Sequence, residues 1–136
     1  MSKKVAILVN EDTMQRCSCG GCLGAVFTKK DSFERYEEEL ELVSFTHSGG
    51  DLQKKIDTMK RKGVEVVHLS SCSRKLPEYR EIAERLSEDF DVVGYTHGDP
   101  IGKSGEAIFL DKKVAGEAEG GRQALAEGER NAVAGE

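Results

Sequence analysis

The sequence has no apolar stretch long enough to cross a membrane, which takes about 20 apolar residues in a helix. Near the N-terminus only the short run Val5–Val9 is apolar, and no small-residue cleavage site follows it. A secretory signal is therefore not expected. We predict a cytoplasmic protein, in which cysteines serve as metal ligands or redox thiols more often than as structural disulfides.

An excess of positive charge is also lacking. With 20 Lys and Arg against 25 Asp and Glu, the formal net charge is −5. Nucleic acids and anionic membranes favour basic surfaces, so neither is an expected partner. The basic run Lys60–Lys62 is short and lies at the end of a predicted helix, where cations complement the helix dipole.

Prolines are few, and a complete phosphate-binding loop is missing. Pro77 and Pro100 are the only prolines, and neither comes directly before a predicted strand, where thioredoxin-like folds keep a cis-proline. A Gly-Lys-Ser occurs within Ile101–Gly105, but His97 stands where such a loop needs its first glycine. Nucleotide binding through this motif is therefore not expected.

Strand-like and helix-like segments alternate along most of the chain. The apolar run Val5–Val9 is typical of a strand buried on both faces of a parallel sheet. Further strands are predicted at 40–46, 64–70 and 90–96, and helices within 23–38, at 52–62 and at 77–89. This order predicts an open three-layer α/β/α sandwich with a mainly parallel sheet of four or five strands. Residues 107–110 suit either the fifth strand or an edge hairpin.

The predicted domain occupies residues 1–111. Residues 112–136 are rich in Ala, Gly and Glu and have almost no large apolar side chain. Such a segment buries too little surface to offset the entropy of ordering, so we expect a flexible or weakly ordered tail.

Cysteines and histidines follow the predicted strands. The candidate ligands are Cys17, Cys19, Cys22, His47, Cys72 and His97. The first three lie in the predicted loop after the first strand, and the others follow the second, third and fourth strands in turn. Because parallel strands end at the same edge of a sheet, we expect all six at the carboxyl edge, where α/β proteins place their ligand sites.

Thiolate and imidazole ligands favour zinc, so a zinc ion is the expected partner. Four protein ligands would make a structural site, and three plus water would make an open one. Other interpretations remain open. Cys19 and Cys22 form a CxxC pair suited to thiol-redox chemistry, and four cysteines suit an iron–sulfur cluster. The acidic, flexible tail suits a noncatalytic interaction module with an unknown protein partner.

Structural roles are the alternative for several of these residues. His47 and His97 suit a strand end and a turn, and Asp51 suits the N-cap of the following helix. Cys72 suits a small buried side chain, although the polar residues around it favour a functional role. His68 lies inside a predicted strand, so we expect a hydrogen-bonded core histidine.

Four segments follow one another in a characteristic order. They are the cysteine-rich first loop, Val43–Thr46 running into Gly49–Gly50, Val67–Cys72 and Thr96–Gly98. This order resembles the CGGC domain family over residues 3–98. The resemblance implies a small metal-binding protein, since the family's many cysteines and histidines suggest zinc.

The chain departs from the family at the namesake motif. In the family, Cys-Gly-Gly-Cys follows the second strand, where this chain reads His47-Ser48-Gly49-Gly50-Asp51. Another Cys-Gly-Gly-Cys occurs at residues 19–22, in the first loop. The resemblance therefore implies Cys72 and the first-loop cysteines as ligands, with His47 and Asp51 as substitutes.

Overall fold

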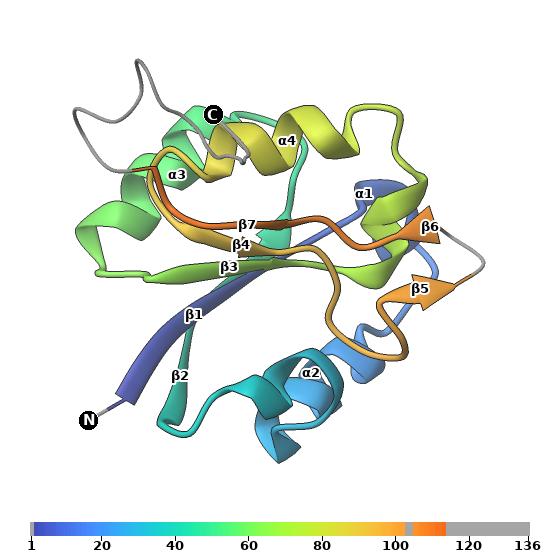
Figure 1. Cartoon of the computed structure of the whole chain (residues 1–136). Coiled ribbons are helices and arrows are strands. Elements are labelled where there is room, and N and C mark those ends of the chain that lie inside the picture. The colour runs from blue at the N-terminus through green and yellow to red at the C-terminus, as the bar shows by residue number, and fades with distance from the viewer. Residues whose placement is uncertain (1, 103–104, 114–136) are drawn as a thin grey trace.

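A five-stranded sheet in the order β2-β1-β3-β4-β7 is the centre of the structure, a computed structural model that describes residues 2–102 and 105–113 (Figure 1). Four strands are parallel: β1 (Ser2–Val9), β2 (Glu39–His47), β3 (Val66–Leu69) and β4 (Asp91–Val93). The short β7 (Phe109–Leu110) pairs antiparallel with β4. The α/β class and the mainly parallel sheet predicted from the sequence are thereby confirmed.

Strand β1 is buried on both faces, as its continuous apolar run predicted. Ala6 and Leu8 belong to one hydrophobic cluster, whereas Val5, Ile7 and Val9 belong to the other. The division follows from strand geometry, because successive side chains point to opposite faces of a sheet.

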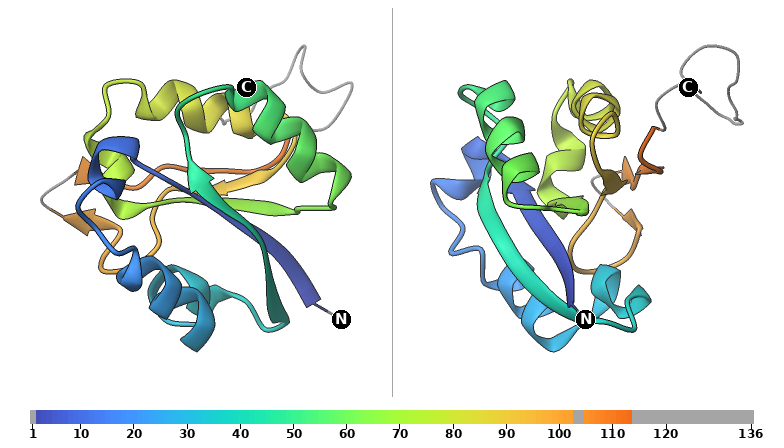
Figure 2. Two further views of the ribbon diagram at one scale, coloured as in Figure 1. Left: turned by 180° about the vertical axis from the view of Figure 1, so that it is seen from behind. Right: turned by 90° about the vertical axis from the view of Figure 1, so that its left-hand side faces the viewer.

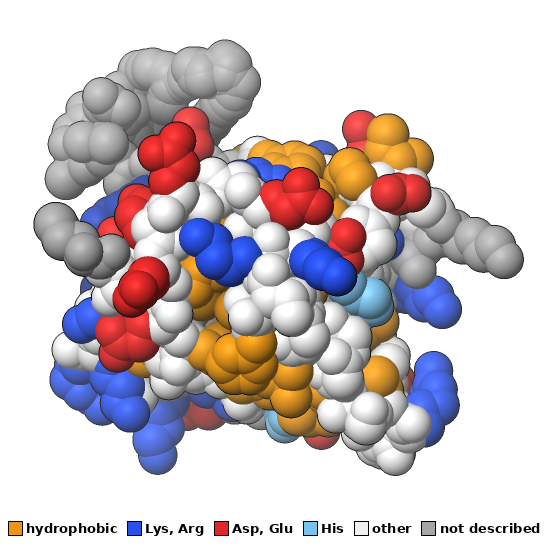
Figure 3. All heavy atoms as spheres, turned by 90° about the horizontal axis from the view of Figure 1, so that it is seen from below, with side chains coloured by type: hydrophobic (Ala, Val, Ile, Leu, Met, Phe, Trp, Pro, Cys, Tyr) orange, Lys and Arg blue, Asp and Glu red, His pale blue; other side chains and the backbone are white. Residues whose placement is uncertain are grey.

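Helices pack against both of these faces (Figures 1 and 2). Two of them, α3 (Leu52–Arg61) and α4 (Tyr79–Leu86), contribute apolar residues to the cluster that contains Ala6. The 3-10 helix η1 (Asp31–Arg35) and helix α2 (Gly20–Thr28) contribute to the other cluster. Figure 3 shows the molecule from below the view of Figure 1, on the side of α2, with hydrophobic side chains in the middle of this surface.

Helix α3 has the start and stop signals that its sequence predicted. The side chain of Asp51 accepts a hydrogen bond from the backbone N–H of Lys54 at 3.1 Å, so Asp51 is an N-cap. Gly63 follows the helix with φ of +83°, a conformation that glycine adopts without steric cost. No helix among the described residues combines the length and apolar character that crossing a bilayer requires.

The segment after β1 differs from the sequence prediction. A loop was expected from Asn10 to about Cys22, but it contains the short helix α1 (Glu11–Met14), and α2 begins already at Gly20. Three glycines lower the intrinsic helix propensity of α2. Burial of Cys22 and its neighbours against the sheet overrides that propensity, which the local sequence does not show.

The third predicted helix, at 77–89, is present as the shorter α4, and a 3-10 helix that was not predicted precedes it. The 3-10 helix η2 (Ser71–Lys75) precedes Pro77, and α4 begins two residues after this proline. The hydroxyl of Tyr79 donates to Gly94 O at 2.8 Å and accepts from Ile108 N at 2.9 Å, which joins α4 to the chain that enters β7.

The chain between β4 and β7 adds a two-stranded hairpin. Its strands are β5 (Ile101–Gly102) and β6 (Gly105–Glu106), and it lies with α1 at the carboxyl end of the parallel strands (Figure 1). The tail predicted at 112–136 lies outside the described residues, apart from Lys112 and Lys113.

Candidate functional site

The first loop is connected to η2 through Asn10, the residue that follows β1. Its side-chain oxygen accepts from Asp12 N at 3.0 Å and caps α1, and its amide nitrogen donates to the carbonyl of Cys72 at 3.4 Å. Asn10 is 7% exposed. The loops after β1 and β3, which carry all four cysteines, are therefore in direct contact.

Cys17 and Cys19 lie together in the turn that leads into α2. The backbone N–H of Cys19 donates to the sulfur of Cys17 at 3.3 Å, and Cys17 is exposed. Cys19 has φ of +66°, a left-handed conformation that is uncommon for a residue other than glycine. Such strain at a thiol-bearing turn is a reason to look for function there.

Cys22 is buried inside α2 and contacts the segment after β4. Its sulfur lies 3.1 Å from the hydroxyl of Thr96, which in turn lies 3.2 Å from Nδ1 of His97. Ser71 of η2 fixes this segment, because its hydroxyl donates to His97 O at 2.7 Å and accepts from the N–H groups of Thr96 and His97 at 3.3 Å.

Gly21 brings His97 against the start of α2. A Cβ atom at Gly21 would lie 2.9 Å from Nε2 of His97 and 3.0 Å from Cδ2. The imidazole thus occupies the space that any other residue at this position would need. The local Cys-Gly-Gly-Cys sequence permits this close approach between helix and histidine.

Cys72 is half-buried in η2 at the end of β3. Its sulfur lies 2.9 Å from the hydroxyl of Ser70, which also lies 2.9 Å from the hydroxyl of Ser73. The thiol is therefore held by a serine pair that is itself buried.

Two of the four thiols, Cys19 and Cys22, have raised pKa values. Burial raises the pKa of Cys19, and the nearby Cys17 and Cys72 raise it further. The pKa of Cys22 is raised to about 11, mainly by burial. The hydrogen bond with Thr96 acts to lower this pKa, and the other three cysteines act to raise it. Ionising several of these thiols together is unfavourable without a compensating positive charge.

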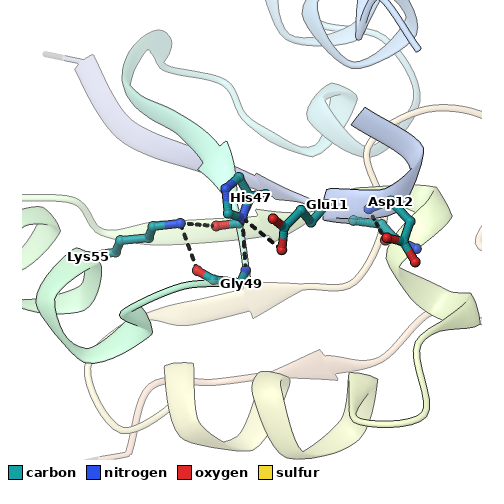
Figure 4. A network of polar contacts seen from close by, with 6 residues as sticks. Glu11, Asp12, His47, Gly49 and Lys55 are labelled. Atoms are coloured by element: carbon teal, nitrogen blue, oxygen red, sulfur yellow. Dashed lines mark hydrogen bonds and ion pairs between the residues drawn. The ribbon is translucent and has the colours of Figure 1, made fainter. Parts of the chain in front are cut away.

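His47 belongs to a different set of contacts at the same edge (Figure 4). Its Nδ1 accepts from Gly49 N at 3.1 Å and lies 3.8 Å from a carboxylate oxygen of Glu11. Lys55 donates to the carbonyls of His47 and Gly49 at 2.7 and 2.8 Å. The described residues show no hydrogen bond or ion pair between His47 and a cysteine.

His68 is the hydrogen-bonded core histidine that the sequence predicted. It is fully buried, stacks on Phe33 with 4.0 Å between ring centroids, and lies 2.7 Å from the Tyr36 hydroxyl through Nε2. Burial lowers the pKa of His68 to about 3, so the ring is neutral at physiological pH.

The cysteine and histidine side chains are of the kind that bind thiophilic cations, but they do not form a closed coordination shell. Within residues 2–102 and 105–113, no group of three or more His, Cys, Asp or Glu side chains is close enough to hold a metal ion. The structure brings Cys17 against Cys19 and Cys22 against the Thr96–His97 pair, and it leaves Cys72 on Ser70. A metal would therefore require these loops to move closer together.

Sequence reasoning missed Thr96 and Ser71, the hydroxyls that organise the site. Both are buried polar residues at strand ends. The available signal was their position beside His97 and Cys72 at the carboxyl edge, where polar side chains of α/β proteins gather around ligands.

Comparison with known families identifies a match. The family model of the CGGC domain matches residues 4–97, more than half of the chain. The chain therefore belongs to the CGGC domain family, for which metal binding is the suggested role. No curated protein and no solved structure matches this chain.

Proposed function

We propose that this CGGC domain binds a zinc ion through thiols at the carboxyl edge of its sheet. The proposed ligands are Cys17, Cys19, Cys22 and Cys72, with His97 as the candidate nitrogen ligand. The observation that carries the proposal is that the segments with these residues meet at one edge, where Asn10 contacts the Cys72 carbonyl and Cys22 contacts Thr96.

Zinc suits this donor set for a physical reason. Thiolates, not thiols, ligate metals, and a divalent cation stabilises thiolates that otherwise repel one another. A tetrahedral sulfur and imidazole shell is the coordination that zinc favours in proteins. When bound, the ion would supply either a structural connection between the first loop and η2 or, with one open position, a Lewis acid.

The proposal requires the first loop to close as the ion binds. Cys17 is exposed and Cys19 is held in a left-handed conformation, so this turn is the part of the site that has room to rearrange. Metal binding that assembles its own site is common, because the binding free energy offsets the cost of ordering the ligands.

We leave His47 outside the proposed thiol set. Its Nδ1 already accepts from Gly49 N, and its carboxylate neighbour is Glu11. His47 therefore provides a control at the same edge of the sheet that lies outside the proposed ligands.

Thiol-redox chemistry through Cys19 and Cys22 is less favoured. Cys22 is 5% exposed, and with a pKa of about 11 it is protonated at neutral pH, which makes it a weak nucleophile. All four cysteines are free thiols, which fits the cytoplasmic location that we propose for the protein.

Metal content tests the proposal. The protein is purified without oxygen and without chelators, and zinc and iron are measured by elemental mass spectrometry in the wild type, Cys72→Ser and His47→Gln. We expect near-stoichiometric zinc that falls in Cys72→Ser and is retained in His47→Gln. Iron with acid-labile sulfide would assign an iron–sulfur cluster instead, and metal-free protein with intact thiols would overturn the proposal.

A further inference from the structure

A pocket lies at the amino edge of the sheet, away from the cysteines. Its volume is about 200 Å³, and it is lined by residues of η1, β3, β4 and β7. Lys3 near the start of β1 and Asp91 at the start of β4 place it at the opposite strand ends from the thiols. The pocket is therefore separate from the proposed metal site.

The floor of the pocket is apolar. Val66 and Val93 line it and are 1% and 6% exposed. Phe109, which also lines the pocket, is 48% exposed. An apolar group of a ligand would cover this surface and gain the free energy of burial.

Two cations line the pocket. Arg35 is held in place, because its Nε donates to Ser32 O at 2.7 Å and its guanidinium carbon lies 5.1 Å from the centre of the Phe109 ring. In the part of the chain that the structure describes, this guanidinium has no ion pair with a carboxylate. Lys3 is the second cation, and it lies 3.7 Å from Glu65.

Two carboxylates line the same pocket. One oxygen of Asp91 accepts from Lys112 N at 2.7 Å, and the other has no hydrogen bond within the described residues. Asp111, just after β7, is exposed and also lines the pocket. The pocket therefore has both a cationic and an anionic part.

Tyr36 adds an acceptor between these charges. Nδ1 of His68 lies 3.1 Å from Tyr95 O, which only accepts, so this nitrogen carries the proton of the neutral ring. Nε2 is then the acceptor, and the hydroxyl of Tyr36 donates to it at 2.7 Å. The lone pairs of the Tyr36 oxygen remain available to a donor in the pocket.

Both charged walls lie near this hydroxyl. Burial raises the pKa of Tyr36, Arg35 acts to lower it, and Asp91 acts to raise it. The cation and the anion therefore both act on the Tyr36 hydroxyl.

We propose that this pocket binds a free α-amino acid with an apolar side chain. Its carboxylate pairs with Arg35, its ammonium group pairs with Asp91 and the Tyr36 oxygen, and its side chain covers the valine floor. A simple anion would leave the carboxylates unpaired, and an uncharged ligand would desolvate all four charges without compensation. The volume is below the roughly 300–1,000 Å³ of pockets for drug-sized ligands, which suits a small molecule.

Titration of the unaltered full-length chain with L-leucine, followed by amide NMR spectra, tests the proposal. We expect saturable shifts at Val66, Val93 and Phe109, and about tenfold or greater loss of affinity for N-acetyl-leucine and for leucinamide, which each lack one charge. Shifts that do not saturate at millimolar leucine, or equal affinity for all three compounds, would overturn it.

Variants then assign the contacts. Arg35→Gln should weaken leucine binding about tenfold or more, whereas Arg80→Gln, at an exposed site on α4, should leave it unchanged. Circular dichroism verifies that each variant is folded. Because the three compounds are compared on the unaltered protein, the proposal stays testable even if Arg35→Gln does not fold. Equal leucine affinity in folded Arg35→Gln and Arg80→Gln would contradict it.

Discussion

The sulfur of Cys22 lies 3.1 Å from the hydroxyl of Thr96, although the two residues are 74 positions apart in the sequence. The contact joins helix α2 to the segment after β4. Thr96 is fully buried and also contacts His97, so the position of this thiol is coupled to that of the imidazole. Loops that follow two different strands thus form one thiol and histidine cluster.

Thr96→Val should weaken zinc binding. The Thr96 hydrogen bond lowers the pKa of Cys22, so its loss raises that pKa further above about 11 and makes the thiolate harder to form. Loss of one hydrogen bond predicts an affinity about fivefold lower, measured by competition with a chelator. Thr28→Val at the end of α2, the helix that contains Cys22, is the control. Within the described residues, the Thr28 hydroxyl donates to Gly24 O and forms no hydrogen bond with a cysteine. Unchanged affinity in Thr96→Val would show that this contact does not tune the thiol.

Two glycines of α2 should respond differently to alanine. At Gly24 a Cβ meets nothing within 4 Å, so Gly24→Ala should stabilise the protein by about 0.5–1 kcal/mol through helix propensity. At Gly21 a Cβ would lie 2.9 Å from Nε2 of His97, so Gly21→Ala should give no such gain and should shift the imidazole resonances of His97. Denaturant unfolding and NMR measure the two effects. Equal stabilisation by both substitutions would contradict the close packing of His97 on Gly21.

His68 should make stability depend on pH below neutrality. Its pKa is about 3 in the folded protein and about 6.5 in the unfolded chain, so only the unfolded state takes up the proton in between. The contribution of His68 to the free energy of unfolding is complete above about pH 6.5 and is lost toward pH 3. Between these values the free energy of unfolding falls by up to about 1.4 kcal/mol per pH unit.

The variant His68→Phe isolates this effect from the titration of carboxylates. It loses the hydrogen bonds of the ring and should be less stable than the wild type at pH 7.5. The difference in unfolding free energy between the two proteins should then shrink as the pH falls from about 6.5 to 4.5, as measured by urea denaturation. A constant difference over this range would mean that His68 does not titrate between the folded and unfolded states.

The elements with a strong pattern were predictable from sequence. Val5–Val9 predicted a buried strand because every side chain is apolar, and α3 was predicted because Leu52, Ile56 and Met59 repeat at helical spacing between Asp51 and Gly63. The start of helix α2 was predicted too late because its glycines favour turns, and the burial that stabilises it depends on the sheet.

The order of the strands across the sheet, which decides which site residues are neighbours, was not predictable from the sequence. The sequence indicated that the loops after parallel strands share one edge, but it did not show that β2 lies on the outer side of β1. That strand order puts His47 beside Val9, where its contacts are Glu11 and Gly49. The roles of Thr96 and Ser71 likewise depend on contacts between distant segments, which no local motif encodes.

X-ray absorption spectroscopy of the zinc-loaded protein tests the central claim most directly. We predict a first shell dominated by sulfur at about 2.3 Å, with at most one nitrogen at about 2.0–2.1 Å, and loss of one sulfur neighbour in Cys72→Ser. A shell of oxygen and nitrogen alone, or a zinc spectrum that is identical in Cys72→Ser, would contradict a thiol-based metal centre at the carboxyl edge of this sheet.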